Sequence, residues 1–208
     1  MAIPVTLLWT APNTTSIAPL QTLAAAGPLV LNGPVGVSIP NFARTITLTS
    51  GFDNSAVNFV IVGKDIFGNT VQETLAGPNA NTVESVNSYH FVSSITTSTA
   101  ITATSAGTGT GGESIWVQLN NFSVSFQTSL NFFVTGTVAY SVVRTPSPFN
   151  TLPFAAPYVA PIDASLTAAS TSQYYNMTMP STGVKVSFAK GAGNTGTTAI
   201  VILQQGIV

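Results

Sequence analysis

The first candidate for a catalytic residue in this sequence is a histidine. His90, the single histidine, lies between Tyr89 and Phe91 in an expected strand. A Ser–His–Asp site would need this imidazole together with an orienting acid and an exposed serine. Serines are so abundant here that their presence carries no weight. We therefore interpret His90 as a histidine at the edge or rim of a sheet.

Six carboxylates are the other candidates for acid–base chemistry. They are Asp53, Asp65, Glu73, Glu84, Glu113 and Asp163. Glu73 and Glu84 are expected on neighbouring strands, which is how a glycosidase places its acid and its base. Nothing nearby in the sequence would separate their pKa values, so we favour solvent-facing charges that protect a sheet face. The sequence therefore predicts no catalytic residue and no enzyme.

Oxygen ligands for a metal ion occur in two short stretches. Residues 53–55 (Asp-Asn-Ser) and Asp65 with Asn69 could offer oxygens to Ca²⁺, but neither has the spacing of a known calcium loop. Turn roles explain them more simply. Without Cys, and with one His, a zinc site would have only carboxylates to add. We predict neither a metal nor a cofactor.

A glycine-rich stretch matches the spacing of a dinucleotide-binding loop. The match is Gly107-x-Gly109-x-x-Gly112. That motif works by holding a diphosphate at the N-terminus of a helix, but residues 114–117 (Ser-Ile-Trp-Val) are strand formers. Residues 129–134 also contain no acid that could bind a ribose. We interpret 106–113 as a loose glycine-rich loop between strands.

Aromatic side chains are the remaining candidates for binding. Trp9, Trp116, Tyr174 and Tyr175 could form a platform for a sugar or a partner protein. Such residues lie more often in a core or at the rim of an interface, because an aromatic ring buries much apolar area.

The composition limits which partners are plausible. Charged residues make up only 5% of the 208 residues, so charge does little to keep exposed strands apart. A net charge of −1 supplies no field that attracts nucleic acid. The mean hydropathy is +0.41, yet no apolar run is long enough for a spanning helix; 130–143 comes nearest. No basic residue precedes Arg44, so we expect no secretory signal and folding in the cytosol.

Residues 44–95 contain the most regular run of expected strands. Side chains alternate with period two in 44–50, 57–62 and 70–75, and 63–69 provides a turn between the last two. Both faces of 57–62 are apolar, which predicts a central strand covered on both sides. The fold expected from this pattern is all-β, an antiparallel β-sandwich of jelly-roll or Ig-like type.

Prolines suggest where this sandwich begins and ends. The first 43 residues contain Pro4, Pro12, Pro19, Pro28, Pro34 and Pro40, which predicts an extended arm that covers either a neighbouring subunit or, slightly favoured, its own sheet edge. We expect an arm (1–43), a main sandwich (44–144), a proline-rich linker (145–164) and C-terminal hairpins (165–208). Those hairpins would form a small second sheet or close the first, with 184–189 and 198–204 paired through the loop 191–196.

Several stretches together resemble small structural proteins of tailed bacteriophage virions. They are 44–50 (RTITLTS), 59–65 (FVIVGKD), 68–73 (GNTVQE), 77–79 (GPN), 82–85 (TVES) and 92–96 (VSSIT), with 184–188 (VKVSF) and 201–206 (VILQQG) similar to their C-terminal hairpins. The resemblance implies a virion component that is assembled in the host cytoplasm.

Two functions agree with this resemblance and with the low charge. The first is a homo-oligomeric capsid decoration (cement) protein that binds the major capsid protein or other virion proteins, with neither nucleic acid nor membrane as a partner. The second is a head-spike, tail or fibre component that recognises host surface polysaccharide through exposed aromatic residues near Trp116 or Tyr174.

Overall fold

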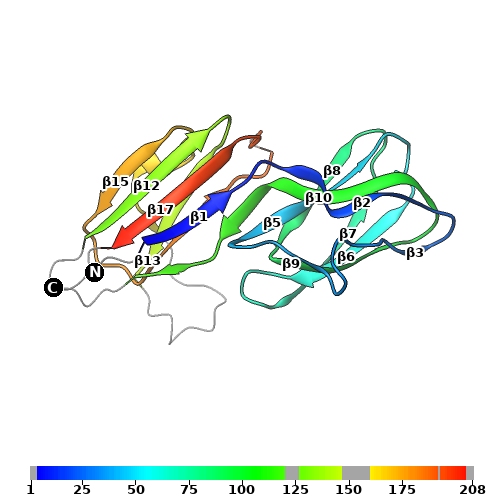
Figure 1. Cartoon of the computed structure of the whole chain (residues 1–208), viewed down its shortest axis with the longest axis horizontal. Helices are drawn as coiled ribbons and strands as arrows, with labels where there is room; N and C mark the ends of the chain where they lie inside the picture. Colours follow the sequence, from blue (N-terminus) through cyan, green and yellow to red (C-terminus); the bar gives the residue numbers. More distant parts are fainter. Residues whose placement is uncertain (1–3, 120–126, 147–159, 192, 205–208) are drawn as a thin grey trace. The chain divides into compact units, whose positions relative to one another are not determined.

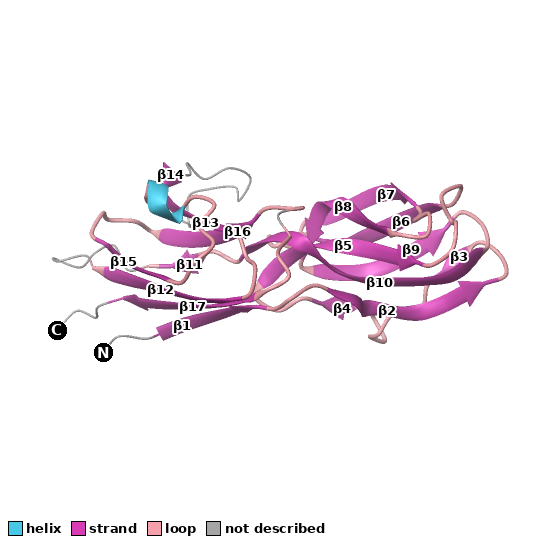
Figure 2. Ribbon diagram, turned by 90° about the horizontal axis from the view of Figure 1, so that it is seen from above, coloured by secondary structure: helices cyan, strands magenta, loops and turns pink. Residues whose placement is uncertain are grey.

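The chain folds into two compact units (Figure 1). The computed structural model describes residues 4–119, 127–146, 160–191 and 193–204. Unit 1 contains residues 1–11 and 113–208, and unit 2 contains residues 12–112. Within the described ranges there is no α-helix, only the 3-10 turn η1 (Ala164–Leu166) among strands (Figure 2). The expected all-β, sandwich-like fold is therefore confirmed.

Unit 2 is built from two antiparallel sheets. Its strands are β2 (Asn13–Leu23), β3 (Gly27–Pro28), β4 (Val37–Ser38), β5 (Phe42–Ser50), β6 (Asn58–Lys64), β7 (Thr70–Ala76), β8 (Thr82–Tyr89), β9 (Phe91–Thr97) and β10 (Ile101–Ser114), whose end belongs to unit 1. One sheet contains β5 between β8 and β10, with β2 on β10. The other has the order β3-β9-β6-β7, with β4 also on β9.

Strand β6 is central in its sheet, as its sequence predicts. It pairs with β7 on one side and β9 on the other, and its core-facing Phe59 and Ile61 are fully buried. Val60 and Val62 on the opposite face are only half-buried, so that face is incompletely covered. The expected β6–β7 hairpin is also confirmed: in its turn Asp65 Oδ1 accepts the backbone N–H of Phe67 and of Asn69.

The first 43 residues are more ordered than an extended arm. Their strands β2, β3 and β4 pair with β10 and β9, so this segment is part of the sheets of its own chain. The prolines are compatible with strands here because Pro28 lies in a two-residue strand and the β2–β10 register is repeatedly shifted.

Unit 1 also consists of two sheets. Its strands are β1 (Pro4–Trp9), β11 (Val117–Gln118), β12 (Thr128–Thr135), β13 (Tyr140–Thr145), β14 (Ala160–Pro161), β15 (Gln173–Met177), β16 (Gly183–Phe188) and β17 (Thr197–Gln204). One sheet has the order β1-β17-β12-β15. In the other, β13 lies between β14 and β16, and β11 pairs with β16.

Stacked aromatic rings join the two sheets of unit 1. Trp9 of β1 stacks on Phe188 of β16 with ring centroids 3.9 Å apart, and Phe132 of β12 stacks on Tyr140 of β13 at 4.6 Å. All four rings are buried. Burial raises the pKa of Tyr140 to about 12, and its hydroxyl donates to the backbone oxygen of Thr171. Ring contacts between the sheets thus join both consecutive strands, β12 and β13, and strands at opposite ends of the chain, β1 and β16.

Two expectations for the second half of the chain are wrong. Residues 184–189 and 198–204 do not pair as a hairpin, because β16 pairs with β13 whereas β17 pairs with β1 and β12 in the other sheet. The sequence of 132–143 also predicts a single strand, but these residues form parts of two strands, β12 and β13, separated by a turn in which Gly136 has a φ of 80°. Alternation marks a buried face but not the partner strand.

The two units do not follow the boundaries expected from the sequence. Strands β12 and β13, expected in the main sandwich 44–144, pack with the C-terminal strands in unit 1, which also takes β1 from the expected arm. The sequence also predicts a strand at 122–127, but residues 120–126 lie outside the described ranges, as do residues 147–159 of the expected linker.

Candidate binding surfaces

The carboxylate of Glu84 connects three strands of unit 2. From β8, its Oε1 accepts the backbone N–H of Thr110 at 2.7 Å and of Gly111 at 3.2 Å, both on β10. It also accepts the hydroxyl of Thr45 on β5. Burial opposes ionisation of Glu84, but these hydrogen bonds outweigh it and lower the pKa of the carboxyl group. Glu84 is thus a structural anion.

Arg44 is the buried cation of the same region. Its guanidinium donates to the backbone oxygen of Gly109, and only 3% of the residue is exposed. Burial lowers the pKa of Arg44 to about 10, an effect that the negative charge of Glu84 partly offsets. Arg44 therefore stays protonated at neutral pH.

Glu73 has a similar role at the edge of the neighbouring sheet. Its two carboxylate oxygens accept the backbone N–H groups of Val86 and Asn87 at 2.8 and 2.9 Å. Both glutamates expected to form an acid–base pair thus bind backbone amides. A glycosidase acid needs a raised pKa, whereas that of Glu84 is lowered.

The glycine-rich stretch is part of the long strand β10 rather than the loop expected from its sequence. A Cβ at Gly107 would lie 1.8 Å from the backbone oxygen of Asn13, and one at Gly109 would lie 2.2 Å from Glu84 Oε1. The glycines allow β2 and the Glu84 carboxylate to approach the strand closely. The dinucleotide motif therefore has a packing explanation, and its strand setting lacks the required helix.

The other carboxylates have local structural partners. Asp53 and Asp163 each accept a backbone N–H two residues ahead, and Asp65 closes its hairpin turn. Glu113 forms an ion pair with Lys185. Across the described ranges, no group of three or more histidine and acidic side chains could hold a metal ion.

His90 is the residue that connects β8 to β9, two strands that belong to different sheets of unit 2. Its Nδ1 is 3.0 Å from the backbone oxygen of Phe42, and the ring is half-buried. Within the described residues, neither a serine hydroxyl nor a carboxylate is hydrogen-bonded to this imidazole. The arrangement is that of a rim histidine and lacks the partners of a catalytic triad.

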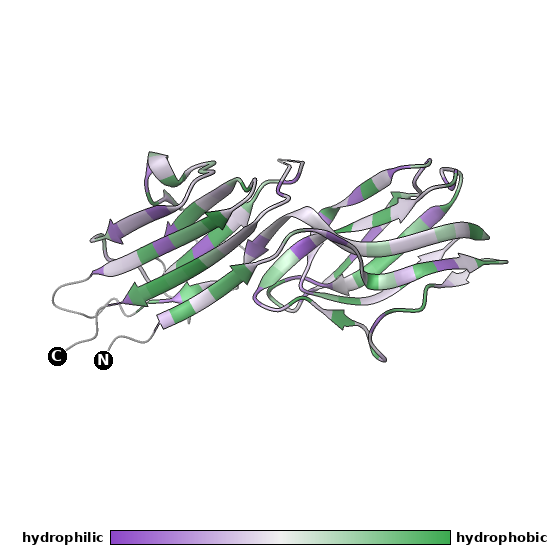
Figure 3. Cartoon of the chain, turned by 45° about the horizontal axis from the view of Figure 1, so that its top comes forward, coloured by the Kyte–Doolittle hydropathy of each residue, from purple (hydrophilic) through white to green (hydrophobic). Residues whose placement is uncertain are grey.

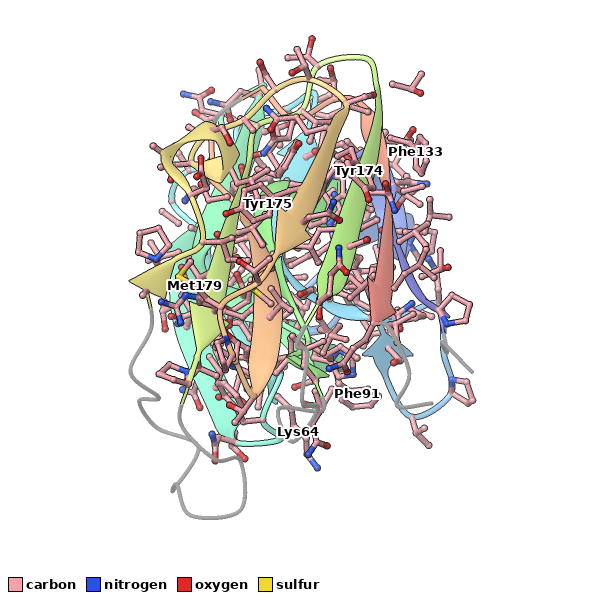
Figure 4. All side chains as sticks on the ribbon, turned by 90° about the vertical axis from the view of Figure 1, so that its left-hand side faces the viewer. Lys64, Phe91, Phe133, Tyr174, Tyr175 and Met179 are labelled. Carbon is pink, nitrogen blue, oxygen red and sulfur yellow. The ribbon has the colours of Figure 1, made fainter. Side chains whose placement is uncertain are left out.

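The four aromatic candidates lie in different environments. Trp9 is fully buried, so the structure removes it from the expected contact residues. Trp116 is half-buried, with Lys185 Nζ 5.3 Å from its ring centroid. Tyr174 is 63% exposed, whereas its neighbour Tyr175 is half-buried. Figure 4 labels both tyrosines and Phe133, which sequence analysis missed.

The sheet β1-β17-β12-β15 has an outer face without charge. Its strands, of 6, 8, 8 and 5 residues, contain no charged side chain. The alternate residues Leu7, Trp9, Phe132 and Ile200 point into the core, so their neighbours point outwards. The register places two rows across this outer face: Leu8, Ala199 and Phe133, then Thr6, Val201, Asn131 and Tyr174.

Exposed apolar side chains lie on the β1 side of that face, in the row from Leu8 on the edge strand β1 to Phe133 on the inner strand β12. Leu8 is 55% exposed and Phe133 is 58% exposed, and β17 ends in a continuous hydrophobic stretch (Figure 3). Towards β15, Ser129 donates to Asn176 Oδ1 at 2.8 Å and lies 3.3 Å from the Tyr174 hydroxyl. The face therefore combines an apolar side, on β1, β17 and β12, with an uncharged polar side at β15.

A second exposed apolar set lies on the charge-free segment 12–43 of unit 2. Leu20, Val30 and Val35 are 63%, 69% and 82% exposed. The side-chain amide of Gln21 holds both backbone groups of Val30, accepting from its N–H at 2.9 Å and donating to its oxygen at 3.1 Å. This contact fixes the two chain segments that carry Leu20 and Val30.

Comparison with known proteins assigns no family to the chain. It matches no protein-family model, and the curated proteins contain no significant sequence match to it. Among the described residues, no helix is both long and apolar enough to cross a membrane.

Proposed function

We propose that this protein is a non-enzymatic structural component of a tailed-phage virion, a decoration (cement) protein that binds and stabilises the capsid lattice. Its partners are the major capsid protein, other virion proteins and further copies of itself. The function requires no cofactor, nucleic acid or membrane. The resemblance of residues 44–96 and 184–206 to phage structural proteins supports this assignment.

The observation that carries the proposal is the exposed apolar segment of unit 2. Leu20, Val30 and Val35 project from a stretch without a single charged side chain. Large apolar side chains exposed on neighbouring, hydrogen-bonded segments, as Leu20 and Val30 are, suit a protein contact site. Because Gln21 already fixes the backbone at Val30, little conformational entropy would be lost on docking. We therefore assign the capsid contact to this segment.

The test uses capsids that lack the protein. Adding the purified wild-type chain is expected to restore resistance to heat and dilution, whereas Val30→Lys is expected to bind at least about tenfold more weakly, since it puts an unpaired charge into the contact. Val86→Lys is the matched control, because Val86 is also an exposed valine of unit 2, at 78%. If capsids without the protein keep full resistance, the cement role is lost.

Recognition of host polysaccharide is a second candidate function. It is favoured by Tyr174, whose exposed ring lies beside the hydrogen-bonded pair of Ser129 and Asn176. Rings and uncharged polar groups are suited to sugars. Binding on a glycan array that is weakened by Tyr174→Ala would support this function. Locating the protein on intact particles by cryo-microscopy would separate a capsid position from a tail position.

A further inference from the structure

We propose that the outer face of the sheet β1-β17-β12-β15 pairs with the same face of a second copy of this chain. This inference names the surface through which copies of the protein associate, and so deepens the proposed function. It rests on the proposed function for the expectation that the protein is a homo-oligomer. Capsid contact is left to the segment 12–43 of unit 2. The two contacts can therefore be disrupted separately.

The absence of charge is the first argument for a second copy as the partner. A two-fold interface places the same patch on both sides, so a charged patch would meet like charges. The four strands of this sheet contain no charged side chain. The charged residues of unit 1 lie on other elements: Glu113, Arg144, Asp163, Lys185 and Lys190. A charged partner surface would find no counter-charge on this face. The same face of a second copy is uncharged too, so the two faces can pair without leaving a charge unpaired.

The distribution of apolar and polar groups is the second argument. Protein interfaces are depleted of charge where they are most buried, and they are enriched in aromatic residues. Here Leu8 and Phe133 flank Ala199 in one row, with both large side chains more than half exposed. Tyr174 and Asn176 lie on the edge strand β15, on the polar side. This one sheet face therefore has the residue composition of a protein–protein interface.

The size of the face sets the expected strength of the contact. Four strands about 4.8 Å apart and up to eight residues long, at about 3.4 Å per residue, cover roughly 500 Å². Two such faces would bury roughly 1,000 Å² in total, which is the lower limit for a specific interface. The expected dimer is therefore weak and concentration-dependent. Copies bound close together on one lattice would form it more readily, because their effective concentration is higher.

The experiment is sedimentation velocity of the full chain over increasing concentration. We expect the wild type to move from monomer to dimer, and Phe133→Lys to weaken association by at least about tenfold, because the substitution buries an unpaired charge in the apolar row of the face. Phe52→Lys is the matched control, since Phe52 is 54% exposed and lies in unit 2. It is expected to dimerise like the wild type. Circular dichroism would verify that both variants are folded.

Hydrogen exchange provides a measurement without substitutions. Amides of β1 and β12 in the wild type should become better protected as concentration rises, whereas those of β6 should not. The proposal is overturned if the wild type stays monomeric at every concentration, or if Phe133→Lys dimerises normally. It is also overturned if the monomer binds neutral polysaccharide through Phe133 and Tyr174.

Failure of this inference is distinguishable from failure of the proposed function. If the wild type is monomeric but still restores capsid stability, the proposed dimer is refuted and the cement role stands. If the protein dimerises through this face but does not bind capsids, the cement role is refuted and the proposed interface stands.

Discussion

The two units share a sandwich architecture but are stabilised by different interactions. In unit 2, the buried Arg44 and the carboxylates Glu84 and Glu73 bind backbone groups of neighbouring strands. In unit 1, stacked ring pairs such as Trp9–Phe188 connect the sheets. Ionic hydrogen bonds are directional and depend on pH, whereas ring stacking is sensitive mainly to volume. The comparison shows that one β-architecture can use either type of interaction.

The same difference affects association. In unit 2, Glu73 occupies two backbone N–H groups of strand β8, which would otherwise be available to another strand. The sheet β1-β17-β12-β15 of unit 1 has no charged side chain with a comparable role. Charge therefore limits pairing at the edge strand β8 of unit 2, whereas the four strands of the unit 1 sheet carry no charge that would oppose the proposed face-to-face pairing.

The largest effect is expected from removing a stacked ring. Trp9→Ala should lower the free energy of unfolding of unit 1 by about 3–5 kcal/mol, because it leaves a cavity against Phe188. Hydrogen exchange should show lost protection in β1, β16 and β17 and unchanged protection in β5 and β6. Thr6→Ala, an exposed position of the same strand, is the control. Equal loss of protection in both units would contradict their separate stabilisation.

A substitution in the glycine-rich strand should have a slightly smaller effect, confined to unit 2. In Gly107→Ala, the new Cβ would collide with the backbone of Asn13 and Thr14, so β2 must move away from β10. We expect a loss of roughly 3 kcal/mol, measured by denaturant unfolding. Gly51→Ala meets nothing within 4 Å and should change stability by less than about 0.5 kcal/mol. A wild-type-like Gly107→Ala protein would refute the packing role of this glycine.

Replacing the structural anion should have an intermediate, pH-dependent effect. Glu84→Gln should cost about 2 kcal/mol at neutral pH, because it weakens the bonds to Thr110 and Gly111 and removes the negative charge near Arg44. The folded-state pKa of Glu84 lies below its usual 4.5. Its contribution is therefore complete above that value and is lost as the pH falls through the lowered pKa.

The pH profile provides the check on this interpretation. Urea unfolding of the wild type from pH 7 down to pH 3 should show a steeper decline than that of Glu84→Gln, and the two curves should converge in acid. Parallel curves would mean that Glu84 does not stabilise unit 2 as an anion.

The smallest effect is expected for the ion pair of unit 1. Glu113→Gln should cost less than about 1 kcal/mol, because Glu113 and Lys185 are partly exposed and water screens their attraction. Urea unfolding would measure this loss. A loss as large as that of Glu84→Gln would remove the proposed contrast between the units.

Local patterns in the sequence predicted part of this structure. Alternating side chains identified β5, β6 and β7, and Asp65 with Gly68 marked the turn between the last two. These features depend on neighbours within a few residues, so a single sequence contains them. The candidate surfaces were only partly predictable: Tyr174 was expected to be exposed, but the same reasoning included the buried Trp9 and missed Phe133.

Pairing between distant strands was not predictable from the same patterns. The amphipathic alternation in β16 and β17 is compatible with a hairpin, yet each strand pairs with a different partner, β13 and β12. This pairing brings together segments from opposite ends of the chain, such as β1 and β17, and Trp9 of β1 stacks on Phe188 of β16; local alternation carries no information on such contacts. The glycine-rich stretch is a second example. Its glycines suggest a loop, but they form a buried strand because Asn13 and Glu84, which are distant in sequence, pack closely against them.

The sequence by itself determined the all-β class, the low charge and the absence of cysteine, because composition and period-two alternation depend on local residues. Only the tertiary structure decided the roles of the charged and aromatic residues. Glu84 became a strand connector and Trp9 a core ring because partners far along the chain enclose them, whereas Phe133 stayed exposed because its neighbours on β12 occupy the inner face.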